Sequence, residues 1–408
     1  MAQRILPEPV LHLSKGSAPA PGFRDFAILG GLESGMRGVL VSVWPLEMYH
    51  ALGDAKVVSW VYTLIGIGSL CFGMLVPGFS RLIPRRWLYT SGAGLYLSAA
   101  LLAIIGGPLL TPIAYLCLCA GTVMVQICVS AYLMDYIARE DLGKSETLRL
   151  FYSAGPWALG PVIGVTLWKV WQPLPFLVGM VGTILMLGYF WHLRMGNGKT
   201  ITRARGPAPN PLAYLGRFVR QPRLVAGWLF AVLRSSGWWV FVVYLPIFCI
   251  QSGLGDQIAS YAFSISQLYL FLSPLMLRWM QKVTLRRAVR IAFALAGLCF
   301  TAAAFGDFWP PLSVLAIMLG AFFLVMLDTF GSLPFLMAVR PAERTEMSAV
   351  YTSYRDVSGI LSPGAAWLVL LVAPVSGVFA ACGAGLGVAW AIASRLHPRL
   401  GREKGSPV

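Results

Sequence analysis

Long apolar runs, separated by short polar or charged breaks, follow one another along most of the chain. Each run is 20 to 29 residues long, and a helix needs roughly 20 apolar residues to cross the hydrocarbon layer of a membrane. Bounded by charged residues, Gly and Pro, the runs predict twelve helices, at 25–49, 55–79, 87–106, 111–137, 147–170, 174–194, 222–250, 257–281, 287–306, 311–338, 347–371 and 374–395. This pattern is typical of an all-α polytopic membrane protein.

A polar, strongly basic segment at 195–221 divides these helices into two sets of six. The segment contains Pro and is too hydrophilic to cross a membrane, so we expect it to be a cytoplasmic linker. The predicted organisation is a tail at 1–24, a six-helix bundle at 25–194, the linker, a second six-helix bundle at 222–395 and a tail at 396–408.

An internal repeat supports this division. Five features recur at a separation of 201 residues: Pro45 and Pro246, the pairs Arg85-Arg86 and Arg286-Arg287, Arg139 and Arg340, Pro173 and Pro374, and Arg194 and Arg395. Chance recurrence of common residues could explain one match but hardly five in register. We infer a duplication and expect two pseudo-symmetric bundles.

The composition excludes several other classes of protein. Charged residues make up 12% of the chain and its mean hydropathy is +0.72, whereas about a quarter of the residues in a soluble domain are charged. These values exclude a soluble enzyme, a disordered chain and a secreted disulfide scaffold. All seven cysteines lie in apolar runs without metal-ligand spacing, and no Walker-type phosphate loop is present. We therefore expect no enzyme, no metal and no cofactor.

The net charge of +16 would suit a nucleic-acid partner, but the positions of the basic residues argue against one. The twelve helices would place 27 of the 32 Lys and Arg residues on a single side of the membrane, the exceptions being Arg37, Lys56, Lys169, Arg234 and Arg355. Such a one-sided distribution marks the cytoplasmic face. The first 22 residues are polar and lack the pattern of a signal peptide. We expect a multi-pass protein of the inner or plasma membrane with both termini in the cytoplasm.

Two parallel six-helix repeats with a basic central loop resemble the major facilitator superfamily over essentially the whole chain. The resemblance implies a secondary transporter that works by alternating access. The segment GFSRLIPRRW after the second helix is similar to the family's gating loop, an Asp-Arg pair followed by Gly-Arg-Arg. Here Ser80 replaces the acid, while Arg81, Arg85 and Arg86 are kept. The alternative is a simple arginine cluster that sets the topology.

A second motif lies in the fifth predicted helix. The segment GPWALGPVIG resembles the G-P-x-x-G-G motif of proton-driven exporters in the family, without its final Gly, and comprises Gly155, Pro156, Gly160, Pro161 and Gly164. Gly lets helices approach closely, and Pro frees a backbone carbonyl and permits a bend. Ordinary helix packing is an equally good interpretation.

Six ionisable residues lie well inside the predicted helices: Glu33, Arg37, Arg234, Asp328, Arg355 and Asp356. Charged groups at membrane depth are costly and usually functional. Their charges sum to zero, as partial desolvation requires. Glu33 and Arg37 are four residues apart, so they share one helical face and can pair.

The resemblance implies that the first, fourth, seventh and tenth helices line the central cavity. Glu33, Arg37, Arg234 and Asp328 would then face the substrate path, together with Gln126, which the repeat aligns within one residue of Asp328. A network that only ties the two halves together is the alternative, and for Arg355 and Asp356 both interpretations stay open. Asp135 and Glu47, near helix ends, are expected at the membrane interfaces.

Aromatic residues cluster at comparable depth, among them Trp238, Trp239, Tyr152 and Tyr351, and with them Tyr62 and Trp157. Such residues commonly fill cores or mark membrane interfaces. The more specific hypothesis is that these aromatic residues line a cavity for a planar or amphiphilic solute.

The leading functional hypothesis is a proton-coupled secondary transporter of a small organic solute, in which Glu33 or Asp328 changes protonation. The arginines suggest that the solute carries an anionic or strongly accepting group. The expected partners are this solute, protons and membrane lipid, and the expected state is a monomer. A lipid or amphiphile flippase of the same fold is one alternative. A non-transporting membrane scaffold is an alternative of another class.

Overall fold

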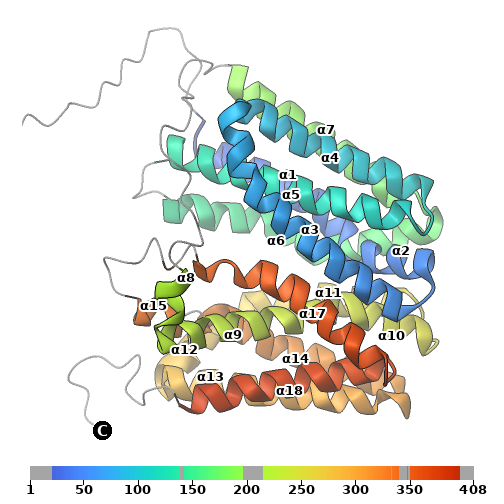
Figure 1. Ribbon diagram of the computed structural model, residues 1–408, viewed down its shortest axis with the longest axis vertical. Coiled ribbons are helices and arrows are strands. Elements are labelled where there is room, and N and C mark those ends of the chain that lie inside the picture. Colours follow the sequence, from blue (N-terminus) through green and yellow to red (C-terminus); the bar gives the residue numbers. More distant parts are fainter. Residues whose placement is uncertain are drawn as a thin grey trace, which may run out of the picture.

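The computed structural model describes residues 21–137, 142–195, 215–331, 333–339, 347 and 350–395, and these residues are almost entirely helical (Figure 1). The first half contains α1 (Phe23–Leu40), α2 (Val43–Leu52), α3 (Ala55–Leu82), α4 (Arg85–Ile105), α5 (Leu110–Tyr136), α6 (Leu142–Val170) and α7 (Leu174–Met195). The second half contains α8 (Leu215–Val219), α9 (Pro222–Trp239), η2 (Val240–Tyr244), α10 (Leu245–Gln251), α11 (Gln257–Leu268), η3 (Tyr269–Leu272), α12 (Ser273–Val283), α13 (Leu285–Ala303), η4 (Ala304–Asp307), α14 (Pro310–Phe330), α15 (Leu333–Ala338), α17 (Tyr354–Leu370) and α18 (Val375–Ser394). Most of the predicted linker and both predicted tails lie outside the described residues.

These elements make up the twelve membrane-crossing segments that the sequence predicts. Within the described residues, ten helical segments are long and apolar enough to span a membrane. The other two crossings are α6, of 29 residues, and α17, of 17 residues. Helix α6 packs mainly against α1, and α17 mainly against α3. The helix predicted at 347–371 differs most, because a turn at 352–353 separates α17, which begins at Tyr354, from the helical residues Met347, Val350 and Tyr351.

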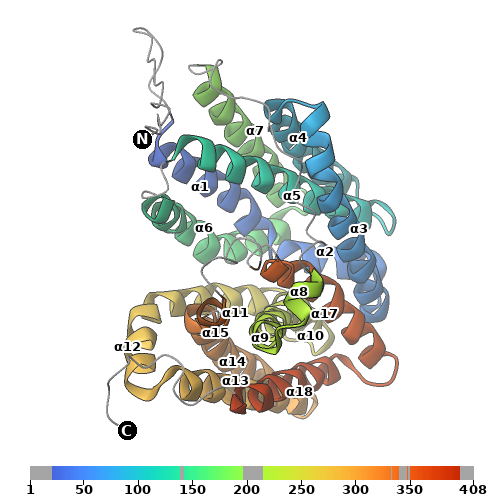
Figure 2. The same cartoon turned by 60° about the vertical axis from the view of Figure 1, so that its left-hand side comes forward.

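Each half folds into a bundle with its own apolar core. Helices α1 to α7 form one bundle and α8 to α18 the other (Figures 1 and 2). Tyr89 and Phe176 are buried in the first core, and Phe293 and Phe330 in the second. We call the end of the bundles where α7 ends and α8 begins the linker side. The opposite end, with the turns at 53–54 and 252–256, is the hairpin side.

The first long helix of each bundle is irregular at the same point of the repeat. A two-residue break at Val41 and Ser42 separates α1 from α2, whereas α9 continues through the π-helical η2 into α10. Pro45 and Pro246 follow these irregularities, 201 residues apart. Proline has no backbone N–H and cannot bond the carbonyl four residues earlier in an α-helix. The duplicated proline therefore accounts for both departures from the α-helix.

The two bundles are packed together on the hairpin side, mainly through α3 with α17 and α6 with α11. Three polar contacts cross between the bundles there: Lys169 Nζ lies 3.9 Å from Asp256 Oδ2, Gln251 Nε2 donates to the Tyr49 hydroxyl at 3.0 Å, and the Tyr244 hydroxyl donates to Ser59 Oγ at 2.9 Å. Val58 of the first bundle lies in the same buried apolar cluster as Phe241 of the second. The hairpin side of the interface is thus closed.

A charged, aromatic cavity between the two bundles

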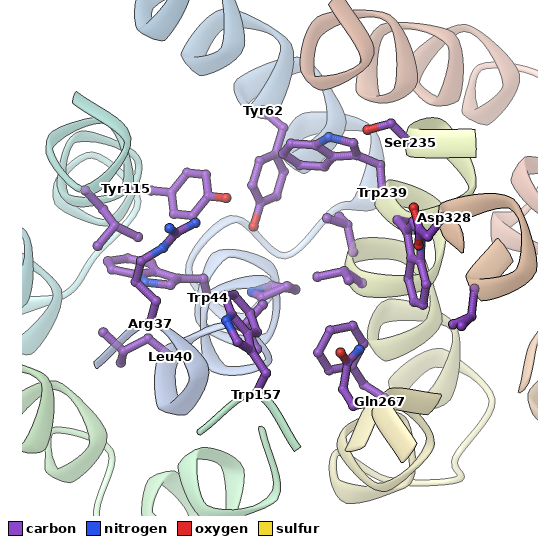
Figure 3. Close-up of a pocket in the computed structure, with 18 of the residues that line it drawn as sticks. Arg37, Leu40, Trp44, Tyr62, Tyr115, Trp157, Ser235, Trp239, Gln267 and Asp328 are labelled. Carbon is purple, nitrogen blue, oxygen red and sulfur yellow. The ribbon is translucent and has the colours of Figure 1, made fainter. Parts of the chain in front are cut away.

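A cavity of about 490 Å³ lies between the bundles, and both contribute to its walls (Figure 3). The first bundle lines it through α1, α2, α3, α5 and α6, and the second through α9, η2, α11, η3 and α14. The lining residues are Arg37, Leu40, Val41, Trp44, Pro45, Tyr62, Tyr115, Leu118, Trp157, Ser235, Trp238, Trp239, Val242, Val243, Phe263, Gln267, Leu270, Val325 and Asp328. Most are apolar or aromatic, and two of them carry a charge.

The first charged group, Arg37, is paired within its own helix. Its Nη1 lies 3.3 Å from Glu33 Oε1, as the four-residue spacing predicts. Glu33 does not line the cavity and is only 8% exposed. The Tyr96 hydroxyl of α4 also donates to Glu33 Oε1, at 3.4 Å. Arg37 therefore faces the cavity with a buried carboxylate behind it.

The second charged group, Asp328 of α14, is paired across helices. Its Oδ1 lies 2.9 Å from Nε of Arg234 on α9, and its Oδ2 accepts a 2.8 Å hydrogen bond from Trp238 Nε1. Arg234 is 8% exposed, donates to the Leu327 carbonyl at 3.5 Å and lies 5.4 Å from the centre of the Tyr354 ring. Here the acid faces the cavity and the base lies behind it, the reverse of the first pair.

Aromatic side chains connect the walls between these charges. The ring centres of Trp44 and Tyr115 are 5.3 Å apart, those of Tyr115 and Tyr62 are 5.1 Å apart, and those of Tyr62 and Trp239 are 6.1 Å apart, all in edge-to-face geometry. The last contact crosses from one bundle to the other. The Arg37 guanidinium lies 5.8 Å from the centre of the Trp157 ring. These rings offer flat apolar surface to a solute.

Some residues predicted for the site do not line the cavity. Gln126 is half-buried on α5, and Tyr152 is exposed on α6. Tyr351 stacks on Phe335 in a separate small cluster, with ring centres 4.0 Å apart.

Arg355 and Asp356 occupy the first turn of α17 and are exposed. The Arg355 Nε donates to the Tyr354 hydroxyl at 3.2 Å. The sequence predicts both residues eight or more positions inside one helix, but the turn at 352–353 interrupts that helix directly before them.

Other lining residues were not singled out by the sequence. Trp44, Tyr115 and Gln267 belong to this group. The position of Trp44 beside the repeated Pro45 is a signal that could have identified it. Tyr115 and Gln267 carry no comparable signal in the sequence.

The glycine-rich motif lies where α6 crosses α1. A side chain on Gly160 would collide with the backbone of Gly38, and one on Gly164 with the Val39 carbonyl oxygen. Gly38 in turn lies so close to α6 that an added Cβ would be 2.5 Å from the Pro156 carbonyl oxygen. Pro156 and Pro161 both lie within α6. The two helices are therefore in backbone contact next to Arg37.

The predicted gating loop is shorter than expected. Ser80 and Arg81 belong to the last turn of α3, with side chains outside the described set, and α4 already begins at Arg85. The Arg86 guanidinium lies 5.9 Å from the centre of the Trp87 ring.

Glu47 was expected at an interface but is buried, with 2% of its surface exposed. Its carboxylate accepts hydrogen bonds from Trp168 Nε1 at 2.8 Å and Gln172 Nε2 at 2.7 Å. These two donors from the end of α6 and the turn after it explain how a carboxylate is accommodated there.

Comparisons with known proteins agree with this architecture. Three solved structures that share the fold are the nucleoside transporter NupG (16% identity, TM-score 0.71, covering 92% of this chain and 99% of that one), a POT family transporter in complex with a thioalcohol conjugated peptide (13%, 0.76, 93% and 97%) and a bacterial homologue of the iron transporter ferroportin in its inward-facing state (14%, 0.67, 91% and 98%). No protein with a curated function matches the sequence. The family profile described as Major Facilitator Superfamily matches residues 26–363. The chain therefore belongs to the major facilitator superfamily of membrane transporters, which are not enzymes.

Proposed function

We propose that the protein is a proton-coupled secondary transporter that moves a small organic solute through the cavity by alternating access. The observation that supports this most strongly is the cavity itself. It lies between two pseudo-symmetric bundles, and each bundle contributes one charged side chain to it. A non-transporting scaffold gains little from such a site.

The cavity suits a small molecule in size and in chemistry. Its volume of about 490 Å³ lies in the range of small-molecule sites, roughly 300–1,000 Å³. The rings of Trp44, Tyr62 and Tyr115 would contact a planar or apolar body. The guanidinium of Arg37 would bind an anionic or strongly accepting group with two hydrogen bonds.

Alternating access requires that the closed side can open. In this conformation the hairpin side is held by the Lys169–Asp256 pair and by the Tyr244–Ser59 hydrogen bond. These contacts would break when the bundles rock to expose the cavity on the other side. With the linker side in the cytoplasm, as the basic residues suggest, the closed hairpin side lies at the outer surface of the membrane.

Glu33 is the carboxylate best placed to carry the proton. It lies behind Arg37 with little exposure, and its described polar contacts are Arg37 and the Tyr96 hydroxyl. A solute anion that binds the cavity-facing donors of Arg37 shares this cation with Glu33 and weakens the Arg37–Glu33 ion pair. A weaker ion pair favours the protonated, neutral form of a buried carboxylate. Solute binding and proton binding are thereby coupled.

Transport into proteoliposomes that contain the pH dye pyranine tests this function. The probes are 3-phenylpropionate, phenylalanine and uridine, which are anionic, zwitterionic and neutral. We expect radiolabelled uptake of at least one probe with simultaneous acidification of the lumen. The variant Glu33→Gln should retain exchange of the solute but lose its response to an imposed pH gradient.

Three results would count against the proposal. Uptake by the wild type that ignores the pH gradient would remove proton coupling. Movement of a fluorescent phospholipid in the absence of any solute uptake would favour the flippase alternative. Stable co-purification with a membrane partner and no uptake would favour a scaffold.

A further inference from the structure

We propose that the solute is a zwitterion with a planar body, bound with its acidic group at Arg37 and its cationic group at Asp328. This inference rests on the proposed transport function and specifies the class of solute. It starts from the signs and positions of the two charges that the cavity presents.

The two charges belong to opposite walls. Arg37 is on α1 of the first bundle and Asp328 on α14 of the second, and aromatic side chains lie between them (Figure 3). Their side chains are exposed to similar extents, 30% for Arg37 and 33% for Asp328. A solute in the cavity therefore meets a cation on one side and an anion on the other.

Each of these groups has binding capacity left after its contacts with the protein. A guanidinium carries five N–H donors, and a carboxylate has about four acceptor positions. The described polar bond of Arg37 goes to Glu33, and those of Asp328 come from Arg234 and Trp238. The partners Glu33 and Arg234 lie outside the cavity lining, so the cavity-facing part of each group remains accessible.

A solute with a single charge would satisfy only one wall. A solute with only an acidic group would bind Arg37 but would displace water from Asp328 without replacing the lost hydrogen bonds. A solute with only an amine would bind Asp328 and would leave Arg37 without its water in the same way. Desolvating an ionised group without a compensating partner is costly, and like charges brought together add repulsion. A zwitterion satisfies both groups at once, so the cavity should discriminate in its favour.

The rings between the charges define the body of the solute. Tyr62, Tyr115 and Trp239 form part of a continuous edge-to-face series. Aromatic residues of this kind bind flat rings by stacking and edge contacts. The simplest compound that fits carries its acidic group and its cationic group at opposite ends of a flat ring, whereas an α-amino acid carries both on one carbon.

Matched trios of compounds test the assignment on the purified full-length protein. The zwitterions 4-(aminomethyl)benzoate, 6-(aminomethyl)naphthalene-2-carboxylate and 5-(aminomethyl)thiophene-2-carboxylate are each compared with two relatives. One is the acid with a methyl group in place of the aminomethyl group, and the other is the amine that lacks the carboxylate. Isothermal titration or thermal shift gives the affinities. For at least one ring we expect the zwitterion to bind about tenfold more tightly than both of its singly charged relatives, as one additional charged hydrogen bond provides.

Variants assign each end of the solute to its residue. Arg37→Gln should lower the affinity for the zwitterion to that for the amine, and Asp328→Asn should lower it to that for the acid. Gln267→Ala, an uncharged change in the same lining, should affect all three members of a trio alike. Arg37→Lys keeps the charge and should keep most of the preference, which serves as the test if Arg37→Gln does not fold.

Two results would overturn the assignment: for every ring the acid or the amine binds as tightly as the zwitterion, or none of the three zwitterions binds. These results are distinct from failure of the transport function. Binding of a zwitterion without uptake into proteoliposomes would refute transport and leave the binding class intact. Uptake of 3-phenylpropionate or uridine without any preference for zwitterions would refute the zwitterion assignment and leave the transport function intact.

Discussion

Glu33 and Arg234 occupy equivalent positions in the two bundles, 201 residues apart, and each binds an oppositely charged residue that lines the same cavity. The duplication has thus kept the position and inverted the charge. In the first bundle the buried member of the pair is an acid, and in the second it is a base. The two pairs differ in one chemical respect, because a carboxylate can take up a proton and a guanidinium remains charged in proteins.

The pair formed by Arg234 and Asp328 should behave as a unit. Because Asp328 is partly exposed, we expect Arg234→Gln and Asp328→Asn each to lower the free energy of unfolding by about 2 kcal/mol, less than for a fully buried pair. The double variant should lose about 1 kcal/mol less than the sum of the single losses. Thermal unfolding of all four proteins in detergent measures this. Strictly additive losses would show that the two groups are not coupled.

The close approach of α1 and α6 makes Gly164 sensitive to a single methyl group. Gly164→Ala would place a Cβ against the Val39 carbonyl oxygen, and we expect a loss of about 3 kcal/mol because neither backbone can yield easily. Gly155→Ala is the matched control on the same helix, since an added Cβ there meets no heavy atom within 4 Å. The control should change stability by less than about 1 kcal/mol, and in the favourable direction. Equal unfolding temperatures for the two variants would contradict the packing argument.

The Tyr244 hydroxyl connects the two bundles on the hairpin side, so its removal should favour opening of that side. Tyr244→Phe leaves Ser59 bonded to the Ala55 carbonyl oxygen, so the change removes the bridge without leaving an unpaired group. A net loss of about 1 kcal/mol corresponds to roughly a fivefold larger open population. Hydrogen–deuterium exchange of peptides from 43–66 and 244–263 should increase.

The control for this prediction is Tyr189→Phe. The Tyr189 hydroxyl donates to Asp25 Oδ1 at 2.8 Å within the first bundle, so the same chemical change does not touch the interface. It should leave exchange of both hairpin-side segments unchanged. Increased exchange in both variants would mean that the effect is general loosening.

Burial of Glu47 should make it important for stability. Glu47→Ala leaves the Trp168 and Gln172 donors without their acceptor, and we expect a loss of about 3 kcal/mol. The control is Lys169→Ala, at the residue after Trp168. It removes the partly exposed 3.9 Å ion pair with Asp256 and should lower the free energy of unfolding by less than about 1 kcal/mol. Chemical unfolding in detergent compares them, and a similar loss for both would show that Glu47 is solvated after all.

The positions of the helices could be predicted because apolar runs and charged breaks alternate so clearly. The spacing of Glu33 and Arg37 also predicted their pairing, since helical periodicity is local. The pairing of Arg234 with Asp328 is of another kind, because 94 positions separate them. The sequence indicated only that their charges balance, and the contact itself depends on how α9 packs against α14.

The aromatic lining was the hardest feature to predict. A Tyr or Trp inside an apolar run has the same sequence context whether it faces a core, lipid or a cavity. Tyr115 and Tyr96 both lie inside apolar runs, yet only Tyr115 lines the cavity. Arg355 and Asp356 are a different case, because they follow a turn at 352–353 that interrupts the predicted helix, and the apolar pattern does not reveal this turn.

The backbone contact between α1 and α6 has a consequence for how selectivity is preserved during motion. Because the backbones of α1 and α6 touch at Gly38, Gly160 and Gly164, we expect the two helices to move together as one rigid unit. Arg37 lies on α1 and Trp157 on α6, so both belong to this rigid unit. Their mutual geometry should then be the same in every state of the cycle, and a ligand designed against this half of the pocket in one state should fit it in the others.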